Sequence, residues 1–335
     1  MRAAVRERYG PPEVVGIREV DRPQPTGDEV LIRVQAASIN RADLDLIRPK
    51  PAFTRLFMGL RRPKERRVGC DVAGVVEAVG PDVTRFQQGD RVFGDLYPFG
   101  LGGFAEFACV PESGLQRVPD AMPIEVAATL PHAAVLAVQG LRRRDGRTIG
   151  RGDRVLIDGG SGSVGPFAVQ IAKAHGAEVS ATCGPAKMDL VRDLGADHVI
   201  DYATTDVTRG EQRYDWILDV DSHHPIRAWR RALARGGTYV TLGGSTRRIL
   251  AALVLGPILS RTADRSMGLL LWWSPFHADD VARLLELAGS GAVRPVIDRT
   301  YPLEQVAEAL RYVDEGLARG KVVIVPRHDT DTDSA

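Results

Sequence analysis

Three glycines, Gly160, Gly162 and Gly165, form the most informative pattern in this sequence. They directly follow an apolar run at residues 155–157 and precede a helix-like segment that starts near Val164. In that context they permit a tight turn, close backbone approach to a pyrophosphate and close packing of the helix on the strand, with the helix N-terminus facing the negative charge. The pattern therefore predicts a dinucleotide site. The alternative is a glycine-rich turn without a ligand.

The next strand-like run, residues 178–182, indicates which cofactor to expect. In NAD sites a carboxylate about 20 residues beyond the glycines binds the ribose 2′-hydroxyl. Here Cys183 follows the run, no acidic residue stands beside it, and Lys187 comes soon after. A cation attracts the 2′-phosphate of NADP, so the sequence favours NADP(H). The alternative is that Lys187 is a solvated charge early in a helix, where the helix dipole disfavours a cation.

These residues must be positioned by two stretches of the chain that differ in sequence pattern. Up to about residue 122, short β-rich runs are punctuated by Gly and Pro, which predicts an irregular, mostly antiparallel β domain. From about residue 125, strand-like and helix-like segments alternate, which predicts a parallel, doubly wound sheet. The expected strands there are residues 154–158, 178–182, 198–201, 216–220, 238–242 and 267–274, and a closing strand is expected at residues 321–325. The expected helices are residues 164–175, 186–194, 226–234, 279–288 and 301–316.

Composition excludes several classes of protein. Of the 335 residues, 44% are hydrophobic and 26% charged, which is typical of globular chains and unlike disordered or fibrous ones. A net charge of +1 gives no reason to expect a nucleic-acid partner. The cysteines, Cys70, Cys109 and Cys183, lack a C-x-x-C spacing, so we expect a reducing, cytoplasmic location without a disulfide framework or a cysteine-built zinc lobe. We expect no secretion signal and no transmembrane segment, because the longest apolar stretch, residues 249–259, is shorter than the roughly 20 residues of a spanning helix.

Several segments together resemble the medium-chain dehydrogenase/reductase superfamily, and within it the zinc-independent, quinone-oxidoreductase-like branch. The resemblance covers nearly the whole chain. It rests on SINRAD at residues 38–43, GCDVAGVV at 69–76, GDRVFG at 89–94, GGFAE at 102–106, SGSVG at 161–165, LGADHVIDY at 194–202 and GKVVI at 320–324.

The resemblance implies an α/β protein with two domains. A GroES-like, β-rich catalytic domain would comprise residues 1–124 and be completed by residues 277–335, and a Rossmann cofactor domain with a doubly wound parallel sheet would comprise residues 125–276. The substrate would lie in the cleft between them, over the nicotinamide. In the family, the position matching Asn40 lies near the nicotinamide and substrate, and those matching Lys187 and Tyr202 lie at the 2′-phosphate.

Site residues follow from the motifs and the resemblance together. The expected cofactor-binding residues are Gly160, Ser161, Gly162, Ser163, Val164, Gly165, Thr182, Cys183, Lys187, Tyr202, Leu242, Gly243, Gly244 and Lys321. The expected catalytic residues are Asn40 and Asp43, and the expected substrate-cleft residues are Cys70, Tyr97 and His132. An amide both donates and accepts hydrogen bonds, which suits Asn40 to orienting a carbonyl. The alternatives are a turn amide for Asn40 and an aromatic cap on the sheet edge for Tyr202.

The zinc-using branch of the superfamily binds its catalytic metal at positions that match Asn40, Cys70 and His132. Asn is a poor zinc ligand, whereas a thiolate and an imidazole are good ones, and Asp43 offers a further oxygen. Against this, the Gly-His-Glu segment of the metal enzymes reads GCD at residues 69–71. We therefore expect no metal, with Cys70 a buried thiol and His132 a polar residue of the cleft.

Without a metal, hydride transfer needs an acceptor that is already electron-poor. Quinones and α,β-unsaturated carbonyls are such acceptors, so the sequence predicts an NADPH-dependent reductase of a small electrophile. The proton donor stays open among Tyr97, His132, Asp43 and water. The alternatives are an NADP-dependent alcohol or aldehyde dehydrogenase with a degenerate zinc site, and a non-catalytic NADPH-binding redox sensor. Family members often pair sheet edges across a homodimer, and we expect one here.

Two further segments have open roles. The basic segment at residues 61–67 is a solvated loop, a lid over the cleft or a contact with an anionic surface. The apolar residues 249–259 line a substrate pocket, seal a dimer or touch a membrane face.

Overall fold

The computed structural model describes residues 1–49, 54–220, 223–261, 265–271 and 273–328. It contains two compact units, one comprising Met1–His132 with Ile297–Ala335 and the other Ala133–Val296. Both boundaries lie later in the chain than the expected 124/125 and 276/277. The second differs because α9 (Ala278–Gly289) packs in the second unit, where Asp280 accepts hydrogen bonds from Gln139 and Arg142 at 2.7 and 2.6 Å.

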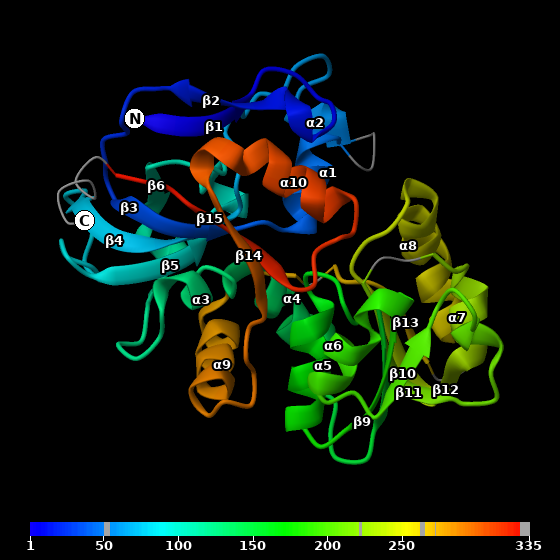
Figure 1. The fold of residues 1–335 in the computed structure, drawn as a ribbon. Coiled ribbons are helices and arrows are strands. Elements are labelled where there is room, and N and C mark those ends of the chain that lie inside the picture. Colours follow the sequence, from blue (N-terminus) through cyan, green and yellow to red (C-terminus); the bar gives the residue numbers. More distant parts are fainter. Residues whose placement is uncertain (50–53, 221–222, 262–264, 272, 329–335) are drawn as a thin grey trace. The chain divides into compact units, whose positions relative to one another are not determined.

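The first unit is built on a seven-stranded sheet of order β14-β15-β3-β4-β5-β7, with β6 paired to β3. Its neighbouring strands are antiparallel except for the parallel pair β14 and β15. Figure 1 shows β15, from the end of the chain, beside β3, from its beginning. The strands are β3 (Glu29–Ser38), β4 (Asp71–Val79), β5 (Arg91–Asp95), β6 (Phe107–Pro111), β7 (Leu115–Arg117), β14 (Ile297–Pro302) and β15 (Lys321–Val325), and a separate hairpin contains β1 (Arg2–Arg6) and β2 (Val15–Glu19).

Short helices connect the strands of this unit. They are α1 (Arg41–Ile47), α2 (Arg55–Met58), α3 (Ile124–Ala127) and α10 (Val306–Asp314), and α4 (Pro131–Gly140) continues into the second unit. β3 contributes to two apolar cores because its alternate residues Val30, Ile32 and Val34 pack on one side, while Ala37 packs with α1 and α10. The end of β3 therefore lies between two cores.

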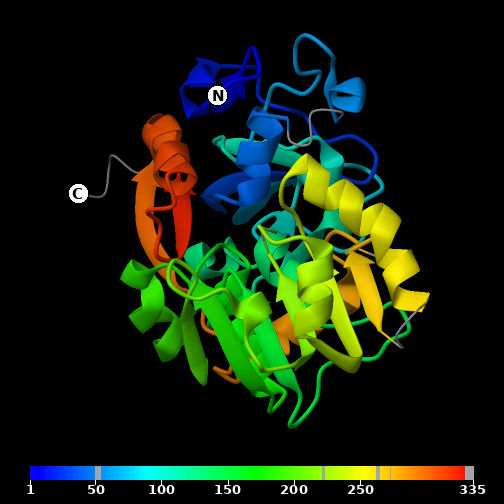
Figure 2. The same ribbon diagram turned by 90° about the vertical axis from the view of Figure 1, so that its right-hand side faces the viewer.

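The second unit contains a six-stranded, wholly parallel sheet of order β10-β9-β8-β11-β12-β13. The order runs outward in both directions from β8, so right-handed crossovers place the helices on both faces. The elements are β8 (Arg154–Asp158), α5 (Gly165–Ala174), β9 (Glu178–Cys183), α6 (Met188–Asp193), β10 (His198–Asp201), β11 (Tyr214–Asp219), α7 (Ile226–Ala232), β12 (Leu233–Thr241), α8 (Thr246–Arg261) and β13 (Ser266–Leu269). Figure 2 shows this sheet with its helices in green and yellow.

Two expected elements differ in the structure, and one helix was not expected. Tyr301 lies in β14 rather than in a helix, because Pro302 holds the residue before it in an extended conformation, and α10 begins only at Val306. The strand expected at 267–274 is the shorter β13, and its residue 272 lies outside the described part of the chain. The apolar residues 249–259 lie within helix α8, which contains Pro257. Of the helices in the described ranges, none has the length and apolar character needed to cross a membrane.

Candidate functional site

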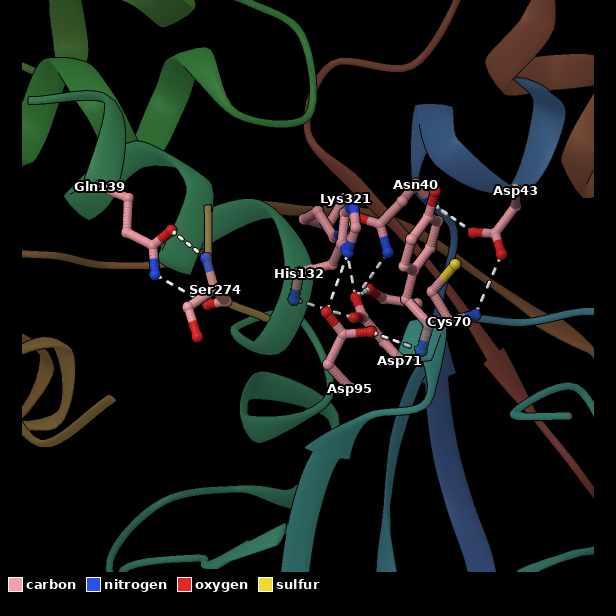
Figure 3. Close-up of polar contacts among 11 residues, drawn as sticks. Asn40, Asp43, Cys70, Asp71, Asp95, His132, Gln139, Ser274 and Lys321 are labelled. Carbon is pink, nitrogen blue, oxygen red and sulfur yellow. Dashed lines mark hydrogen bonds and ion pairs between the residues drawn. The ribbon is translucent and has the colours of Figure 1, made fainter. Parts of the chain in front are cut away.

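A cluster of polar side chains is buried in the first unit at the ends of β3, β4, β5 and β15 (Figure 3). We call it the buried polar cluster; it consists of Ser38, Asn40, Asp43, Cys70, Asp71, Asp95, His132 and Lys321. None of these residues is more than 6% exposed. Because buried polar groups are costly unless they are paired, the contacts inside the cluster determine what it can do.

Asp71, the first residue of β4, is the centre of the cluster. Its Oδ2 accepts hydrogen bonds from Ser38 Oγ at 2.5 Å and Asn40 Nδ2 at 2.8 Å. Its Oδ1 accepts the backbone N–H of His132 at 3.0 Å, in the first turn of α4. Burial raises the pKa of Asp71, and the neighbouring Lys321 ammonium opposes that rise. The carboxylate is therefore held by four partners from three separate parts of the chain.

Lys321 brings a positive charge into the cluster. Its Nζ lies 2.6 Å from Asn40 Oδ1 and 3.5 Å from Asp71 Oδ2. Burial lowers the pKa of Lys321, and Asp71 is the largest influence that raises it. The antiparallel register of β15 on β3 places the residue there, because the N–H of Ile39 donates to Val322 O at 2.9 Å. Both ends of the Asn40 amide are thus occupied.

Asp95, the last residue of β5, lies opposite Asp71 in the register of β4 and β5. Two carboxylates that lie directly opposite each other on neighbouring strands repel each other. Asp95 Oδ2 lies 2.9 Å from His132 Nδ1, and Asp95 Oδ1 accepts the N–H of Tyr97 at 2.8 Å. Burial acts to lower the pKa of His132, but Asp95 and then Asp71 raise it above its ordinary value. The ring of Tyr97 lies 5.4 Å from that of His132, centroid to centroid.

Asp43 holds the loop before α1 to the loop before β4. Its Oδ2 accepts the N–H of Asn40 at 2.8 Å, and its Oδ1 accepts the N–H of Cys70 at 3.0 Å. Burial raises the pKa of Asp43 to about 6. Burial, followed by Asp43 and the other cluster carboxylates, raises the pKa of the Cys70 thiol well above its ordinary value. These contacts make Asp43 a positioning residue for Asn40 and Cys70.

The glycine-rich turn lies in the second unit, between β8 and α5. Gly159 has the left-handed φ of +95°, so the tight turn that the sequence assigned to Gly160 occurs one residue earlier. A Cβ on Gly160 would lie 2.9 Å from Ala181 Cβ. At Gly165 a Cβ would lie 2.1 Å from the carbonyl oxygen of Gly159, so this glycine lets α5 start against the turn.

The end of β9 supports that turn. Thr182 Oγ1 donates to Asp158 Oδ1 at 2.5 Å and accepts the N–H of Gly159 at 3.0 Å, while Thr182 O accepts the N–H of Gly160 at 2.8 Å. The side chains of Thr182 and Cys183 are both buried. Thr182 thus positions the turn.

Lys187 and Tyr202 lie close to the carboxyl ends of β9 and β10. The N–H of Tyr202 donates to Cys183 O at 3.3 Å, and its ring is 63% exposed. A Cβ on Gly184 would lie 3.0 Å from the Tyr202 hydroxyl, so the phenol lies beside Gly184. The N–H of Lys187 donates to Gly184 O at 3.0 Å. The two residues therefore lie at the same edge of the sheet as the glycine-rich turn.

Three further expected cofactor residues follow β12. The N–H of Leu242 donates to Asp219 O at 2.9 Å, at the end of β11, and Gly243 O accepts the hydroxyl of Thr241 at 3.0 Å. Gly244 has a φ of +120°. Leu242, Gly243 and Gly244 thus also lie at the carboxyl edge of the sheet, where doubly wound folds bind their ligands.

The structure brings together all five residues that the sequence assigned to catalysis and the substrate cleft, but it places Lys321 with them. We expected Lys321 at the cofactor; its side chain contacts Asn40 and Asp71, and its part in cofactor binding stays a prediction. Ser38, Asp71 and Asp95 were not among the expected site residues. Acidic residues at the start or end of apolar strand runs were the available signal for the two aspartates. Among the described residues, no group of three His, Cys, Asp or Glu side chains is arranged to hold a metal ion.

Comparison with known proteins agrees with this architecture. The chain matches the alcohol dehydrogenase GroES-like domain over residues 26–120 and the zinc-binding dehydrogenase family over residues 194–324. The mitochondrial NAD(P)H oxidoreductase RTN4IP1 of Mus musculus is 34% identical, covering 89% of this chain and 81% of that protein. The chloroplastic NADPH-dependent alkenal/one oxidoreductase of Arabidopsis thaliana is 31% identical, with coverages of 97% and 80%. The structure of the quinone oxidoreductase from Coxiella burnetii matches with a TM-score of 0.85 at 26% identity, covering 98% of this chain and 99% of that one.

A GroES-like domain joined to a Rossmann domain with a glycine-rich turn defines an oxidoreductase that uses a nicotinamide cofactor, and the expected fold is confirmed. The chain belongs to the medium-chain dehydrogenase/reductase superfamily, in its quinone-oxidoreductase-like branch. Its substrate is a small molecule.

Proposed function

We propose that this protein is an NADPH-dependent reductase that transfers hydride directly to a quinone or an α,β-unsaturated carbonyl, without a metal ion. The observation that carries the proposal is the buried ammonium of Lys321, at 2.6 Å from Asn40 Oδ1 and 3.5 Å from Asp71 Oδ2. It places a fixed positive charge beside one of the positions at which the zinc-using branch binds its metal.

The donor set at those positions does not fit zinc. Asn40 Oδ1 accepts from Lys321 and Asn40 Nδ2 donates to Asp71, so a divalent cation at Asn40 would face a buried ammonium. Zinc binds the thiolate form of cysteine, and burial beside carboxylates raises the pKa of the Cys70 thiol. These contacts support the metal-free part of the proposal.

The carboxyl edge of the second unit's sheet supports NADPH as the cofactor. β9 ends at Cys183, and no carboxylate follows it to bind a ribose 2′-hydroxyl. Lys187 and the exposed Tyr202 lie at this edge, where a 2′-phosphate gains a charge-assisted hydrogen bond. The Arabidopsis relative is itself named for its dependence on NADPH.

The substrate class follows from the chemistry that a bound nicotinamide supplies, which is hydride transfer. An acceptor that is not polarised by a metal must be electron-poor by itself. Quinones and enones meet this condition, and the names of the Coxiella and Arabidopsis relatives refer to these two classes. In the balanced reaction the acceptor gains a hydride and a proton, and NADPH becomes NADP⁺.

The proton has one favoured source among the open candidates. Asp43 uses both carboxylate oxygens to accept backbone N–H groups, and burial raises the pKa of Tyr97. The imidazole of His132 is oriented through Nδ1 by Asp95, and that carboxylate helps to keep the ring protonated. His132, positioned by Asp95, is therefore our choice of proton donor.

Assembly and location complete the proposal. β13 is an edge strand of the six-stranded sheet, and an edge of this kind is a template for pairing with a second copy. We propose a homodimer formed at that edge and a cytoplasmic location. The Mus musculus and Arabidopsis relatives are named as mitochondrial and chloroplastic proteins, so fractionation of the native cell decides the location.

The test is oxidation of NADPH and, in parallel, NADH by the purified protein with a panel of quinones and enones, with and without a strong chelator. Chelator-resistant turnover that prefers NADPH is expected. Chelator-sensitive turnover with simple alcohols or aldehydes would instead indicate a metal-using dehydrogenase. Tight NADPH binding without turnover of any acceptor would indicate a redox sensor.

A further inference from the structure

The second unit contains a cavity of about 540 Å³ whose wall is dominated by arginine. It is lined by Arg213, Arg227, Arg230, Arg231, Leu259 and Arg265. All of these residues belong to the unit Ala133–Val296, so the cavity is formed within one compact unit. We call it the arginine cavity.

The arginine cavity lies at the sheet edge opposite to the glycine-rich turn. Arg213 directly precedes β11 and Arg265 directly precedes β13, so both lie at the amino ends of parallel strands. The glycine-rich turn and Lys187 follow the carboxyl ends of β8 and β9. Parallel strands have all their amino ends at one edge, so the cavity is separate from the proposed cofactor site.

Backbone carbonyl groups hold two of the guanidinium groups in place. Arg213 donates from Nη1 to the carbonyl oxygens of residues 210–212 at 2.8–2.9 Å. Arg265 donates from Nε to Ala234 O at 2.9 Å. These bonds orient the side chains but leave their charges in place, so the cavity wall is organised before any ligand arrives.

Five of the six residues that line the arginine cavity are arginines. In the part of the chain that the structure describes, no carboxylate forms an ion pair with Arg213, Arg227, Arg231 or Arg265. Burial, followed by Arg230 and Arg235, lowers the pKa of Arg265. The dipole of α7 favours cations in its last turn, which accounts for Arg230 and Arg231 but not for the arginines that precede strands. Crowded like charges carry a cost that a bound anion removes.

We propose that the arginine cavity binds a ligand that carries two or more phosphate groups. Guanidinium groups match phosphate oxygens with paired, charge-assisted hydrogen bonds. An oligophosphate concentrates several negative charges in a space of this size, whereas a carboxylate brings one charge per group. The volume is within the range of small-ligand sites. The site is independent of the reductase proposal, and its ligand is either a free oligophosphate or the headgroup of a phosphorylated lipid.

Isothermal titration calorimetry with inorganic tripolyphosphate tests the site directly. The variants are R227Q/R231Q, which removes two exposed arginines of the cavity, and R144Q, a control at an exposed arginine of the same unit outside it. A third variant, K187A, shows whether tripolyphosphate binds at the proposed cofactor edge instead. We expect binding to weaken by about 10-fold to 100-fold in R227Q/R231Q and to stay within about twofold of wild type in the other two.

Three results would overturn the inference: no binding to the wild-type protein, equal weakening in R144Q, or loss in K187A with binding retained in R227Q/R231Q. The thermal midpoint of each unliganded variant checks that it folds, and NADPH turnover of R227Q/R231Q is expected to equal that of wild type. Flotation with phosphatidylcholine vesicles, with and without phosphatidylinositol bisphosphate, then separates the two sources. Binding to the bisphosphate vesicles that R227Q/R231Q lacks supports the lipid headgroup, and tripolyphosphate binding without flotation supports a free oligophosphate.

Discussion

The ammonium of Lys321 lies 2.6 Å from the side-chain oxygen of Asn40, although 281 positions separate the two residues in the chain. The pairing of β15 with β3 brings them together in the interior of the first unit. A buried ammonium persists only where a counter-charge is fixed beside it, and Asp71 supplies that charge at 3.5 Å. The closing strand of the chain thus completes the charge balance of the buried polar cluster.

Replacing Lys321 with Met leaves Asp71 buried opposite Asp95 without its cation. The free energy of unfolding should fall by about 3–5 kcal/mol, the cost of breaking a buried pair. Adding Asp71→Asn should recover part of the loss, because the uncompensated charge is then gone. Urea unfolding measures the free energy of unfolding of both variants.

The control is Lys173→Met, which removes an ion pair with Asp197. The side chains of this pair are 33% and 37% exposed, so its loss should cost less than about 1 kcal/mol. Equal losses at the two lysines would contradict the assigned role of Lys321.

His132 gives the stability a defined dependence on pH. The carboxylates of Asp95 and Asp71 raise the pKa of His132 in the folded protein above the ordinary 6.5, although burial alone lowers it. The folded state therefore keeps the proton at a pH where the unfolded state has lost it, and the stabilisation is complete below pH 6.5 and is lost as the pH rises through the folded-state pKa.

Urea unfolding across this window should show a free energy of unfolding that falls with pH in the wild-type protein. His132→Asn should remove that part of the slope. Asp95→Asn should shrink it, because Asp95 is the largest influence that raises the pKa. A slope unchanged in His132→Asn would show that another group titrates there.

Lys187→Ala tests the choice of cofactor. Losing a charge-assisted hydrogen bond to the 2′-phosphate should weaken NADPH binding by about 1–3 kcal/mol and leave NADH binding nearly unchanged. Fluorescence titration of both cofactors measures this, with Arg144→Ala as a control at an exposed arginine of the same unit. Equal loss for NADPH and NADH would mean that Lys187 does not lie at the 2′-phosphate.

Two glycines of one turn should respond differently to the same change. A Cβ at Gly165 would lie 2.1 Å from Gly159 O, so Gly165→Ala should lower the free energy of unfolding by about 1–3 kcal/mol. At Gly162 the nearest atom would lie 3.7 Å away, so Gly162→Ala should keep its stability. It should nevertheless weaken NADPH binding, because the backbone at this glycine is expected to approach the pyrophosphate. Thermal unfolding and cofactor titration separate the effects, and unimpaired NADPH binding in Gly162→Ala would remove that glycine from the site.

The parallel sheet was predictable because its strands are apolar runs of ordinary length with a glycine-rich turn in the expected place. β14 was not, because Ile297–Pro302 contains three consecutive polar residues, Asp298, Arg299 and Thr300, and lies close to a strongly helical segment. Helix α8 was also missed, since Gly256 and Pro257 interrupt its apolar run. In both cases pairing or packing with other elements decides the local structure.

The buried polar cluster was predictable only in part. Asn40, Asp43 and Cys70 lie in motifs that mark them, but the position of Lys321 depends on the register of β15 against β3. The opposition of Asp71 and Asp95 likewise depends on the register of β4 and β5. Registers of this kind join segments that are distant in the sequence, so no local pattern reveals which charges will face each other.

In the proposed reaction, hydride passes directly from NADPH to an electron-poor carbon without a metal. The most direct test uses NADPH labelled with deuterium at the transferable position, an enone substrate and protein whose metal content has been measured after chelation. We predict one deuterium on the reduced carbon of the product, at a rate independent of residual zinc. Turnover that disappears on chelation and returns in proportion to added zinc would contradict the account.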